Sequence, residues 1–182
     1  MTLNMKKNKS NNTPISVEQI ITKNSHHFFS DYNEDRYIKS HGKNERIVVE
    51  EKKRKYSLTN DLQKEIIVYH IDNGLITEKE KGDKKCDFGI YTEDELLILV
   101  ELKGADYEQA VRQILNTTKK LGITKGSKII RKLLARVVLS KGINVPELRS
   151  SELTQLKLLL KQFNGNILAK SRVLEETLSK IQ

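Results

Sequence analysis

The chain has 182 residues and a formal net charge of +9, and 37% of its residues are hydrophobic against 31% charged. These values fit one soluble globular domain, and no apolar run is long enough to span a membrane. The single cysteine, Cys86, excludes an internal disulfide and agrees with a cytoplasmic protein. One cysteine and four scattered histidines also argue against a structural zinc site.

The charge is unevenly distributed along the chain. Residues 1–60 carry a net +5, residues 61–103 carry −5, and residues 104–182 carry +9. A basic body around an acidic centre suits a polyanion held near carboxylates that bind a cation. The alternative explanation for the excess of basic residues is that they are solvated lysines on helix faces.

The N-terminal part of the chain gives the weakest pattern. Residues 1–14 are rich in Lys, Asn and Ser without periodicity, which predicts a disordered tail before a single domain over residues 15–182. Ser16 can cap a short helix through about Lys23. Between residues 25 and 63 only Ile47–Val49 resembles a strand, and the charged run that follows it is an exposed edge or a loop.

The middle of the chain predicts strands. Residues 64–71 form a β-rich run, and Asp72-Asn73-Gly74 supplies a turn. Residues 86–91 alternate, so that Cys86, Phe88 and Ile90 are expected on one face, and Asp87, Gly89 and Tyr91 on the other. Residues 92–95 form a hairpin loop, and the unbroken apolar run 96–102 predicts a central strand buried on both faces.

The C-terminal part alternates between helices and strands. A helix begins at Asp106, has one apolar face and ends at Gly122. A strand within 129–140, an amphipathic helix over 151–163 and a last strand over 167–174 follow. The whole order predicts an α/β fold, a mixed central β-sheet flanked by helices.

The central strand ends in two charged residues. Glu101 and Lys103 are two residues apart, so both side chains leave the same face of the sheet, and Asp87 on the preceding strand is the third member of the group. Such charges are costly at a buried strand end unless they are paired, metal-bound or otherwise used. Carboxylates on a rigid sheet suit Mg²⁺ or Mn²⁺. The alternative is a structural ion pair that includes Lys103 at a sheet edge.

The chain has Asp87, then thirteen intervening residues, then Glu101-Leu102-Lys103. This arrangement resembles the motif of the PD-(D/E)xK nuclease superfamily, whose restriction-endonuclease-like core has the order αβββαβ. The resemblance covers about residues 64–174 by element order, although only the short motif is specific. It implies that Asp87 and Glu101 bind Mg²⁺ (or Mn²⁺) and that Lys103 assists hydrolysis of a DNA phosphodiester. Cys86 stands where the name of the motif implies a proline, and is expected to be a small core residue.

The resemblance also suggests supporting residues. Several members of the superfamily have a metal-supporting glutamate on the first helix, for which Glu18 is the first candidate here and Glu65 the second. Gln113 resembles a glutamine that some members place near the active-site lysine, and is taken as a catalytic candidate. The alternative is that Gln113 is an ordinary glutamine that faces solvent.

Basic residues later in the chain are candidates for contact with nucleic acid. They are Lys119, Lys120, Arg131, Lys132 and Arg136. Aromatic residues make up only 5% of the chain and Trp is absent, so contact with a duplex backbone is favoured over stacking on single strands. A small nuclease that cuts both strands needs two active sites, which predicts a homodimer.

The leading hypothesis is therefore a DNA endonuclease of restriction, phage-defence or mobile-element biology, with a junction resolvase as a variant. The rival is a catalytically silent nucleic-acid-binding or assembly subunit of the same fold. A third possibility is a domain that binds small molecules or proteins and contains an accidental ion pair. The sequence does not distinguish DNA from RNA.

Overall fold

The computed structural model describes residues 37–72, 74–76, 84–127, 129–141 and 150–182. The predicted tail over residues 1–14 and the predicted helix over 16–23 lie outside these residues. The strands are β1 (Ile38–Gly42), β2 (Arg46–Glu51), β3 (Arg54–Thr59), β4 (Ile66–His70), β5 (Phe88–Thr92), β6 (Leu96–Lys103), β7 (Lys132–Leu139), β8 (Ile167–Ser171) and β9 (Val173–Thr177). The helices are α2 (Tyr107–Lys120), α3 (Ser151–Gln162) and α4 (Leu178–Ile181).

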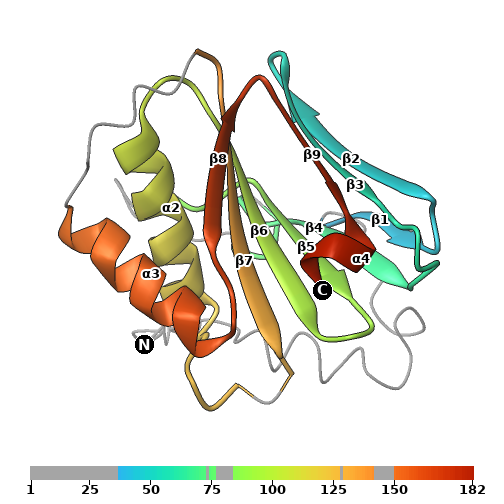
Figure 1. Cartoon of the computed structure of the whole chain (residues 1–182). Coiled ribbons are helices and arrows are strands. Elements are labelled where there is room, and N and C mark those ends of the chain that lie inside the picture. The colour runs from blue at the N-terminus through green and yellow to red at the C-terminus, as the bar shows by residue number, and fades with distance from the viewer. Residues whose placement is uncertain (1–36, 73, 77–83, 128, 142–149) are drawn as a thin grey trace, which may run out of the picture.

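Three layers make up the described part of the chain. A six-stranded sheet has the order β1-β4-β5-β6-β7-β8, antiparallel from β1 to β6 and parallel from β6 to β8. Helices α2 and α3 cover one face of this sheet, and a three-stranded sheet of order β2-β3-β9 covers the other (Figure 1). The predicted α/β class with a mixed sheet is confirmed, but helices flank only one face of the large sheet, because the small sheet covers the other.

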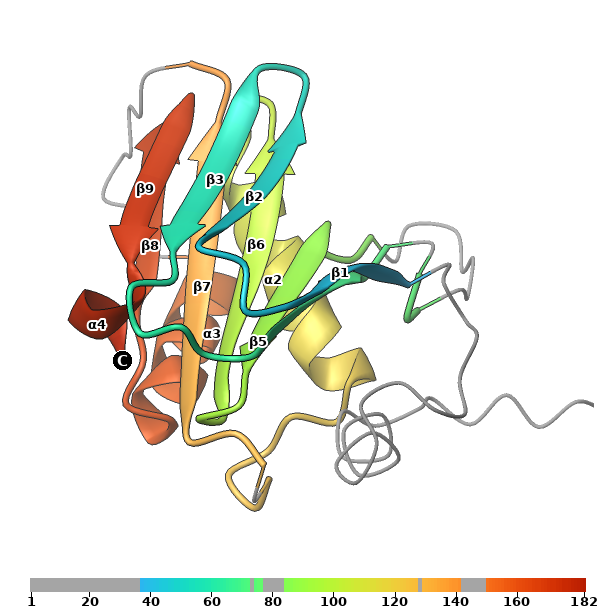
Figure 2. The ribbon, with the colours of Figure 1, turned by 90° about the vertical axis from the view of Figure 1, so that its right-hand side faces the viewer.

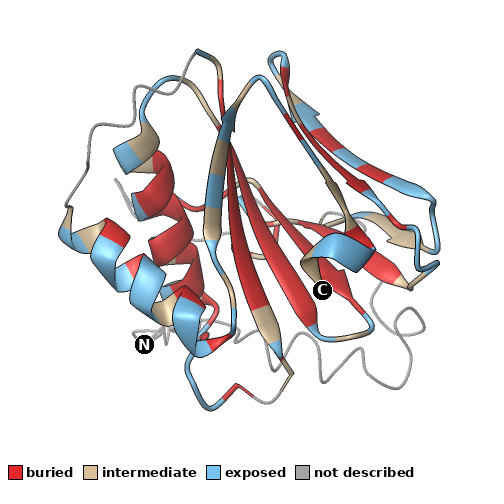
Figure 3. Ribbon diagram, viewed as in Figure 1, coloured by how far each residue is buried: buried red, intermediate tan, exposed pale blue. Residues whose placement is uncertain are grey.

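Strand β6 lies in the middle of the large sheet and is buried on both faces. Leu97 and Leu99 pack with the helices, whereas Ile98 and Val100 pack toward the small sheet. Figure 3 shows the same buried centre across the neighbouring strands. Apolar side chains are therefore needed on both faces, which explains why the run 96–102 does not alternate with polar residues.

The sequence predicts the ends of α2 correctly. The Asp106 carboxylate caps the helix by accepting a hydrogen bond from the Gln109 backbone N–H over 2.8 Å. Gly122 follows the helix with φ +65°, a left-handed conformation that glycine adopts without strain. Lys119 and Lys120 occupy the last turn, where their positive charges interact favourably with the helix dipole.

The predicted last strand, 167–174, is wrong as a single strand. The chain forms β8 at the edge of the large sheet and then β9 in the small sheet, with Arg172 between them at φ +63°. The Arg172 N–H donates to the Leu139 carbonyl over 2.7 Å, and the Arg172 carbonyl accepts from the Lys55 N–H over 2.9 Å. One residue thus joins both sheets at the point where the chain changes sheet.

The predicted strand at Ile47–Val49 is confirmed within β2, but β1 and β3 were not predicted. The charged run after β2 contains a tight turn at Lys52 and Lys53, which have φ values of 47° and 65°. Strand β3 then returns antiparallel to β2. Polar and charged residues within these strands weaken the alternating pattern of apolar and polar residues from which strands are predicted.

The predicted common face of Cys86, Phe88 and Ile90 is also wrong. Cys86 packs among the residues on the helix side, whereas Phe88 and Ile90 pack toward the small sheet. Strand β5 begins only at Phe88, and the Cys86 N–H donates to Thr117 Oγ1 of α2 over 2.8 Å. Cys86 therefore lies before the strand begins, where side chains do not yet alternate between the two faces of the sheet. Cys86 is fully buried, as expected for a small core residue.

Candidate active site

Asp87 is held between two strand ends. Its backbone carbonyl accepts a hydrogen bond from the Ile71 N–H over 2.9 Å, just beyond β4. Its carboxylate Oδ2 accepts one from the Leu102 N–H of β6 over 2.7 Å. Asp87 is thereby fixed beside the C-terminal end of β6, as the predicted hairpin requires.

Glu101 and Lys103 leave β6 on the side of α2, because they continue the alternation of Leu97 and Leu99. Glu101 is only 1% exposed. Its Oε1 lies 3.8 Å from Lys103 Nζ, but its buried Oε2 has no hydrogen-bond partner among the described residues. A buried carboxylate oxygen without a donor is costly and marks a position where a cation or donor would be favourable.

Gln113 lies on the first half of α2 and faces the strand. Its Oε1 accepts a hydrogen bond from Lys103 Nζ, and its Nε2 donates to the Lys85 carbonyl over 2.8 Å. Gln113 is buried, so the solvent-facing alternative is excluded for it. The structure therefore brings together four of the predicted residues: Asp87, Glu101, Lys103 and Gln113.

Burial is the main electrostatic feature of this site. It raises the pKa of Glu101 to about 9, with the nearby Asp87 charge adding to the effect and Lys103 partly opposing it. Burial also raises the pKa of Asp87 to about 6, and the Leu102 N–H opposes this shift. The two buried carboxyl groups thus hold protons at neutral (Glu101) or mildly acidic (Asp87) pH, because burial disfavours their charged forms more than the nearby Lys103 favours them.

The raised pKa values predict proton-coupled cation binding. A cation needs the charged carboxylates, so its affinity should increase with pH between about 6 and 9 and reach a plateau above that range. Because Glu101 is protonated at pH 7, binding of Mn²⁺ there should release about one proton. Calorimetric titration in two buffers with different ionisation enthalpies measures this release. Affinity that stays constant from pH 6 to pH 9 would contradict the prediction.

Two further carboxylates affect the electrostatics of the pair. The charge of Glu51, at the end of β2, raises the pKa of Asp87, and the charge of Asp72, just after β4, raises that of both Asp87 and Glu101. The sequence predicts a turn at Asp72, and its position directly after a predicted strand is the signal that could have placed it near the site. Glu51 belongs to the charged run that the sequence predicts as an exposed edge or a loop, and nothing in that pattern indicates its proximity to Asp87.

The third metal-supporting carboxylate is not identified. Within the described ranges, no three His, Cys, Asp or Glu side chains are grouped closely enough to hold a metal ion. Glu18 lies outside those ranges. Glu65, the second candidate, precedes β4, whose first residue pairs with the last residue of β5. It is therefore at the opposite end of the sheet from Asp87, and its carboxylate contacts His41 at 2.6 Å.

The predicted nucleic-acid contacts lie far from this site. Lys119 and Lys120 are at the C-terminal end of α2, and Arg131 and Lys132 are at the start of β7. In the parallel register, Lys132 pairs with Leu96 at one end of β6, whereas Lys103 is at the other end. Seven residues of strand separate these positions by roughly 23 Å. The connection from β6 through α2 to β7 returns the chain to the opposite end of the sheet.

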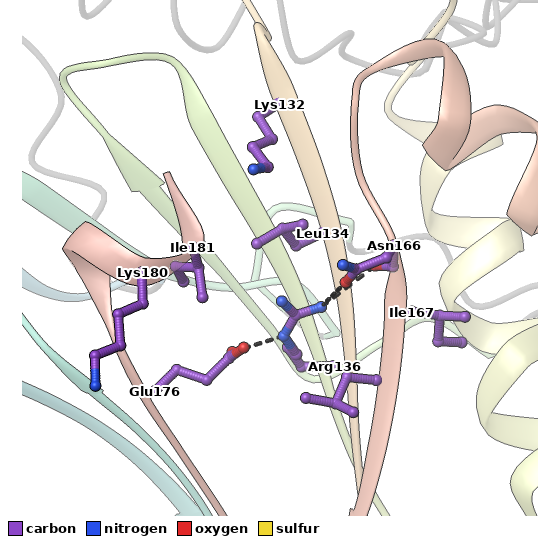
Figure 4. Close-up of a pocket in the computed structure, with 9 residues that line it drawn as sticks. Lys132, Leu134, Arg136, Asn166, Ile167, Glu176, Lys180 and Ile181 are labelled. Atoms are coloured by element: carbon purple, nitrogen blue, oxygen red, sulfur yellow. Dashed lines mark hydrogen bonds and ion pairs between the residues drawn. The ribbon is translucent and has the colours of Figure 1, made fainter.

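Arg136 is buried inside the protein and does not lie on its surface. It is 2% exposed, and its Nε lies 2.6 Å from Glu176 Oε2 (Figure 4). Its Nη1 donates to Asn166 Oδ1 over 2.9 Å, and Tyr56 donates its hydroxyl to the same Glu176 oxygen over 3.0 Å. The guanidinium thus links β7 of the large sheet to β9 of the small sheet, which corrects its predicted role as a phosphate contact.

Comparisons with known protein families, curated proteins and solved structures found no match to this chain. No helix in the described ranges combines the length and the apolar character needed to cross a membrane.

Proposed function

We propose that the protein is a metal-dependent endonuclease that hydrolyses DNA phosphodiester bonds, as the resemblance of its motif to PD-(D/E)xK nucleases suggests. The observation that carries the proposal is the meeting of Asp87, Glu101 and Lys103 at one strand end, with Glu101 Oε2 buried and lacking a donor in the described structure. A purely structural ion pair would not leave that oxygen unsatisfied.

The order of elements supports the same proposal. Strands β4, β5 and β6 form an antiparallel meander, α2 follows, and β7 pairs parallel to β6. This is the βββαβ part of the αβββαβ order expected from the resemblance. The residues for which the sequence predicts the first helix, 16–23, are not among the described ones.

The carboxylates of Asp87 and Glu101 fit a hard divalent cation, because each offers oxygen ligands on a rigid strand end. Bound there, Mg²⁺ would lower the pKa of a coordinated water and balance negative charge on the phosphate. Lys103 lies next to Glu101, and Gln113 fixes its ammonium group. In this position Lys103 can hold the attacking water or contact the scissile phosphate.

Substitution of Lys103 tests the proposal. Purified protein with Mg²⁺ or Mn²⁺ should convert supercoiled DNA to nicked and linear forms, and EDTA should prevent this. Lys103→Ala should lower the single-turnover rate by roughly 10² to 10⁴, the range expected for loss of a positioned acid–base or charge-stabilising group. Lys157→Ala removes an exposed lysine from α3 and serves as the matched control.

Cleavage that survives Lys103→Ala at the control rate would refute the assigned site. Comparison of four-way junctions with linear duplex would identify a junction resolvase, and sedimentation would test the proposed homodimer. The same assay on RNA would define the preferred nucleic acid.

The alternative function is a catalytically silent nucleic-acid-binding or assembly subunit. One observation favours it, namely that a third carboxylate does not complete a metal-binding group within the described ranges. DNA binding without cleavage in Mg²⁺, Mn²⁺ or Ca²⁺, together with no proton release on addition of Mn²⁺, would support this alternative.

A further inference from the structure

The end of the sheet that holds the candidate site also gathers exposed positive charge from several separate segments. The residues concerned are Lys52, Lys53, Lys141, Lys170 and Arg172, here called the basic rim, and all five are exposed. They come from the β2–β3 turn, the segment after β7, the end of β8 and the β8–β9 junction. Figures 1 and 2 both show these connections at the same end of the molecule, where β6 and β7 end.

Strand register places the rim next to Lys103. Lys103 pairs with Leu139 on β7, and Leu139 pairs with Ser171 on β8. Two strand spacings therefore separate Lys103 from the β8 end, a distance of roughly 10 Å between backbones. Arg172 follows immediately, and its carbonyl binds the N–H of Lys55 on β3. The rim thus extends across the strand ends from the candidate site to the small sheet.

The β2–β3 turn is linked to the site by an independent observation. Glu51, directly before this turn, is close enough to Asp87 for its charge to raise the Asp87 pKa. Glu51 also pairs with Lys52 at 3.2 Å, which neutralises that lysine. By contrast, Lys53, Lys141, Lys170 and Arg172 form no ion pair with other described residues. Four cations at this end thus have no ionic partner within the described part of the chain.

The opposite end of the sheet has a different charge balance. The loop between β5 and β6 contributes Glu93, Asp94 and Glu95 there, close to the predicted contacts. Lys64 lies 3.0 Å from Asp94, and Arg131 donates to the Asp94 carbonyl over 3.3 Å. Positive and negative groups are thus interspersed at that end, which makes it a weaker surface for a polyanion.

We propose that the basic rim is the surface that binds the phosphate backbone of duplex DNA and directs it across the strand ends to Asp87, Glu101 and Lys103. This inference rests on the proposed endonuclease function and specifies how its substrate is held. Backbone contact fits the rim because the residues are cations on long side chains without an accompanying aromatic platform. The predicted contacts Lys119, Lys120 and Arg131 are not part of this surface.

Two triple variants with the same loss of charge test the inference. The rim variant is Lys53→Asn, Lys170→Gln and Arg172→Asn, in which asparagine suits the two positions with positive φ. The matched control is Lys119→Gln, Lys120→Gln and Arg131→Gln. Fluorescence anisotropy with a labelled 30-base-pair duplex in EDTA, at several KCl concentrations, measures binding without cleavage, and thermal unfolding confirms that both variants are folded.

We expect the rim variant to lose affinity at least tenfold at low salt. The slope of log K against log salt should fall by about 2.7, since three phosphate contacts are removed. The control should change affinity less than twofold. Equal losses in both variants, no loss in the rim variant, or no binding by the unmodified protein would each overturn the inference.

A nicking assay on the same proteins distinguishes this inference from the proposed function. Cleavage that depends on Lys103 but not on the rim would refute the rim and leave the endonuclease standing. Rim-dependent binding without cleavage in any divalent metal would retain the rim as a binding surface and refute the endonuclease.

Discussion

Replacement of Glu101 by glutamine is expected to abolish cleavage while making the protein more stable. Glutamine has nearly the shape of a protonated glutamate but cannot supply the charged oxygen that a divalent cation requires. We expect the nicking rate to fall at least about a hundredfold, a loss typical of removing a main electrostatic group from an active site. Opposite effects on activity and stability would identify Glu101 as a functional residue whose burial is costly.

The stability effect of Glu101→Gln should depend on pH. The pKa of Glu101 is raised to about 9 in the folded protein, so its burial costs little below the ordinary pKa of 4.5 and progressively more as pH increases toward 9. In EDTA, the gain in unfolding free energy should be near zero at pH 4.5 and increase to at most about 5 kcal/mol at pH 8. Thermal and urea unfolding at several pH values measure this difference.

Glu108→Gln provides the matched control for this experiment, because Glu108 is an exposed glutamate on α2. It should leave both cleavage and the pH dependence of stability unchanged. A Glu101→Gln variant that is destabilised at pH 8 would show that the carboxylate has a partner that stabilises its charged form, contrary to the prediction.

Replacement of Arg136 by methionine is expected to give the largest loss of stability. The change leaves the Glu176 carboxylate buried between the two sheets without its main cation, although the Tyr56 hydroxyl still donates to it. Breaking one partner of a buried ion pair typically costs about 3 to 5 kcal/mol. For a chain of this length, the melting temperature should decrease by roughly 10 °C.

A double-mutant cycle isolates the contribution of the Arg136–Glu176 ion pair to the stability of the protein. Arg136→Met combined with Glu176→Gln should recover part of the lost stability, since no unpaired charge then remains buried. Arg131→Met, at an exposed position, should change stability by less than about 0.5 kcal/mol. A stable Arg136→Met variant with weakened DNA binding would instead support the original assignment of Arg136 to a phosphate contact.

The sequence predicts the end of the fold that holds the candidate site well, because that end depends on local patterns. The apolar run of β6, the Asp106 cap and the periodicity of α2 are all visible over short windows. Together they place Glu101 and Lys103 on one face and Gln113 opposite them. A hairpin then requires Asp87 to lie near the same strand end.

The remaining features depend on partners that are distant in the sequence. Arg136 is indistinguishable from a surface arginine until Glu176, 40 residues later, is known to meet it between two sheets. The division of 167–177 into β8 and β9 reflects pairing with β7 and β3, which local propensity does not encode. The sequence alone could have predicted that Lys119 and Arg131 lie at the opposite end of the sheet from Lys103. A parallel β6–α2–β7 crossover must return the chain to that end.

The change of sheet at Arg172 has a consequence for the folding mechanism. Two strands alone are rarely stable in water, so the β2–β3 hairpin needs β9, which follows it in the sequence by more than a hundred residues. Such non-local pairing is slow because a long loop must close before the contact forms. The hairpin should therefore become ordered late, after the meander and α2 have assembled. The residues of the candidate site would therefore come together before the proposed DNA-binding surface is complete.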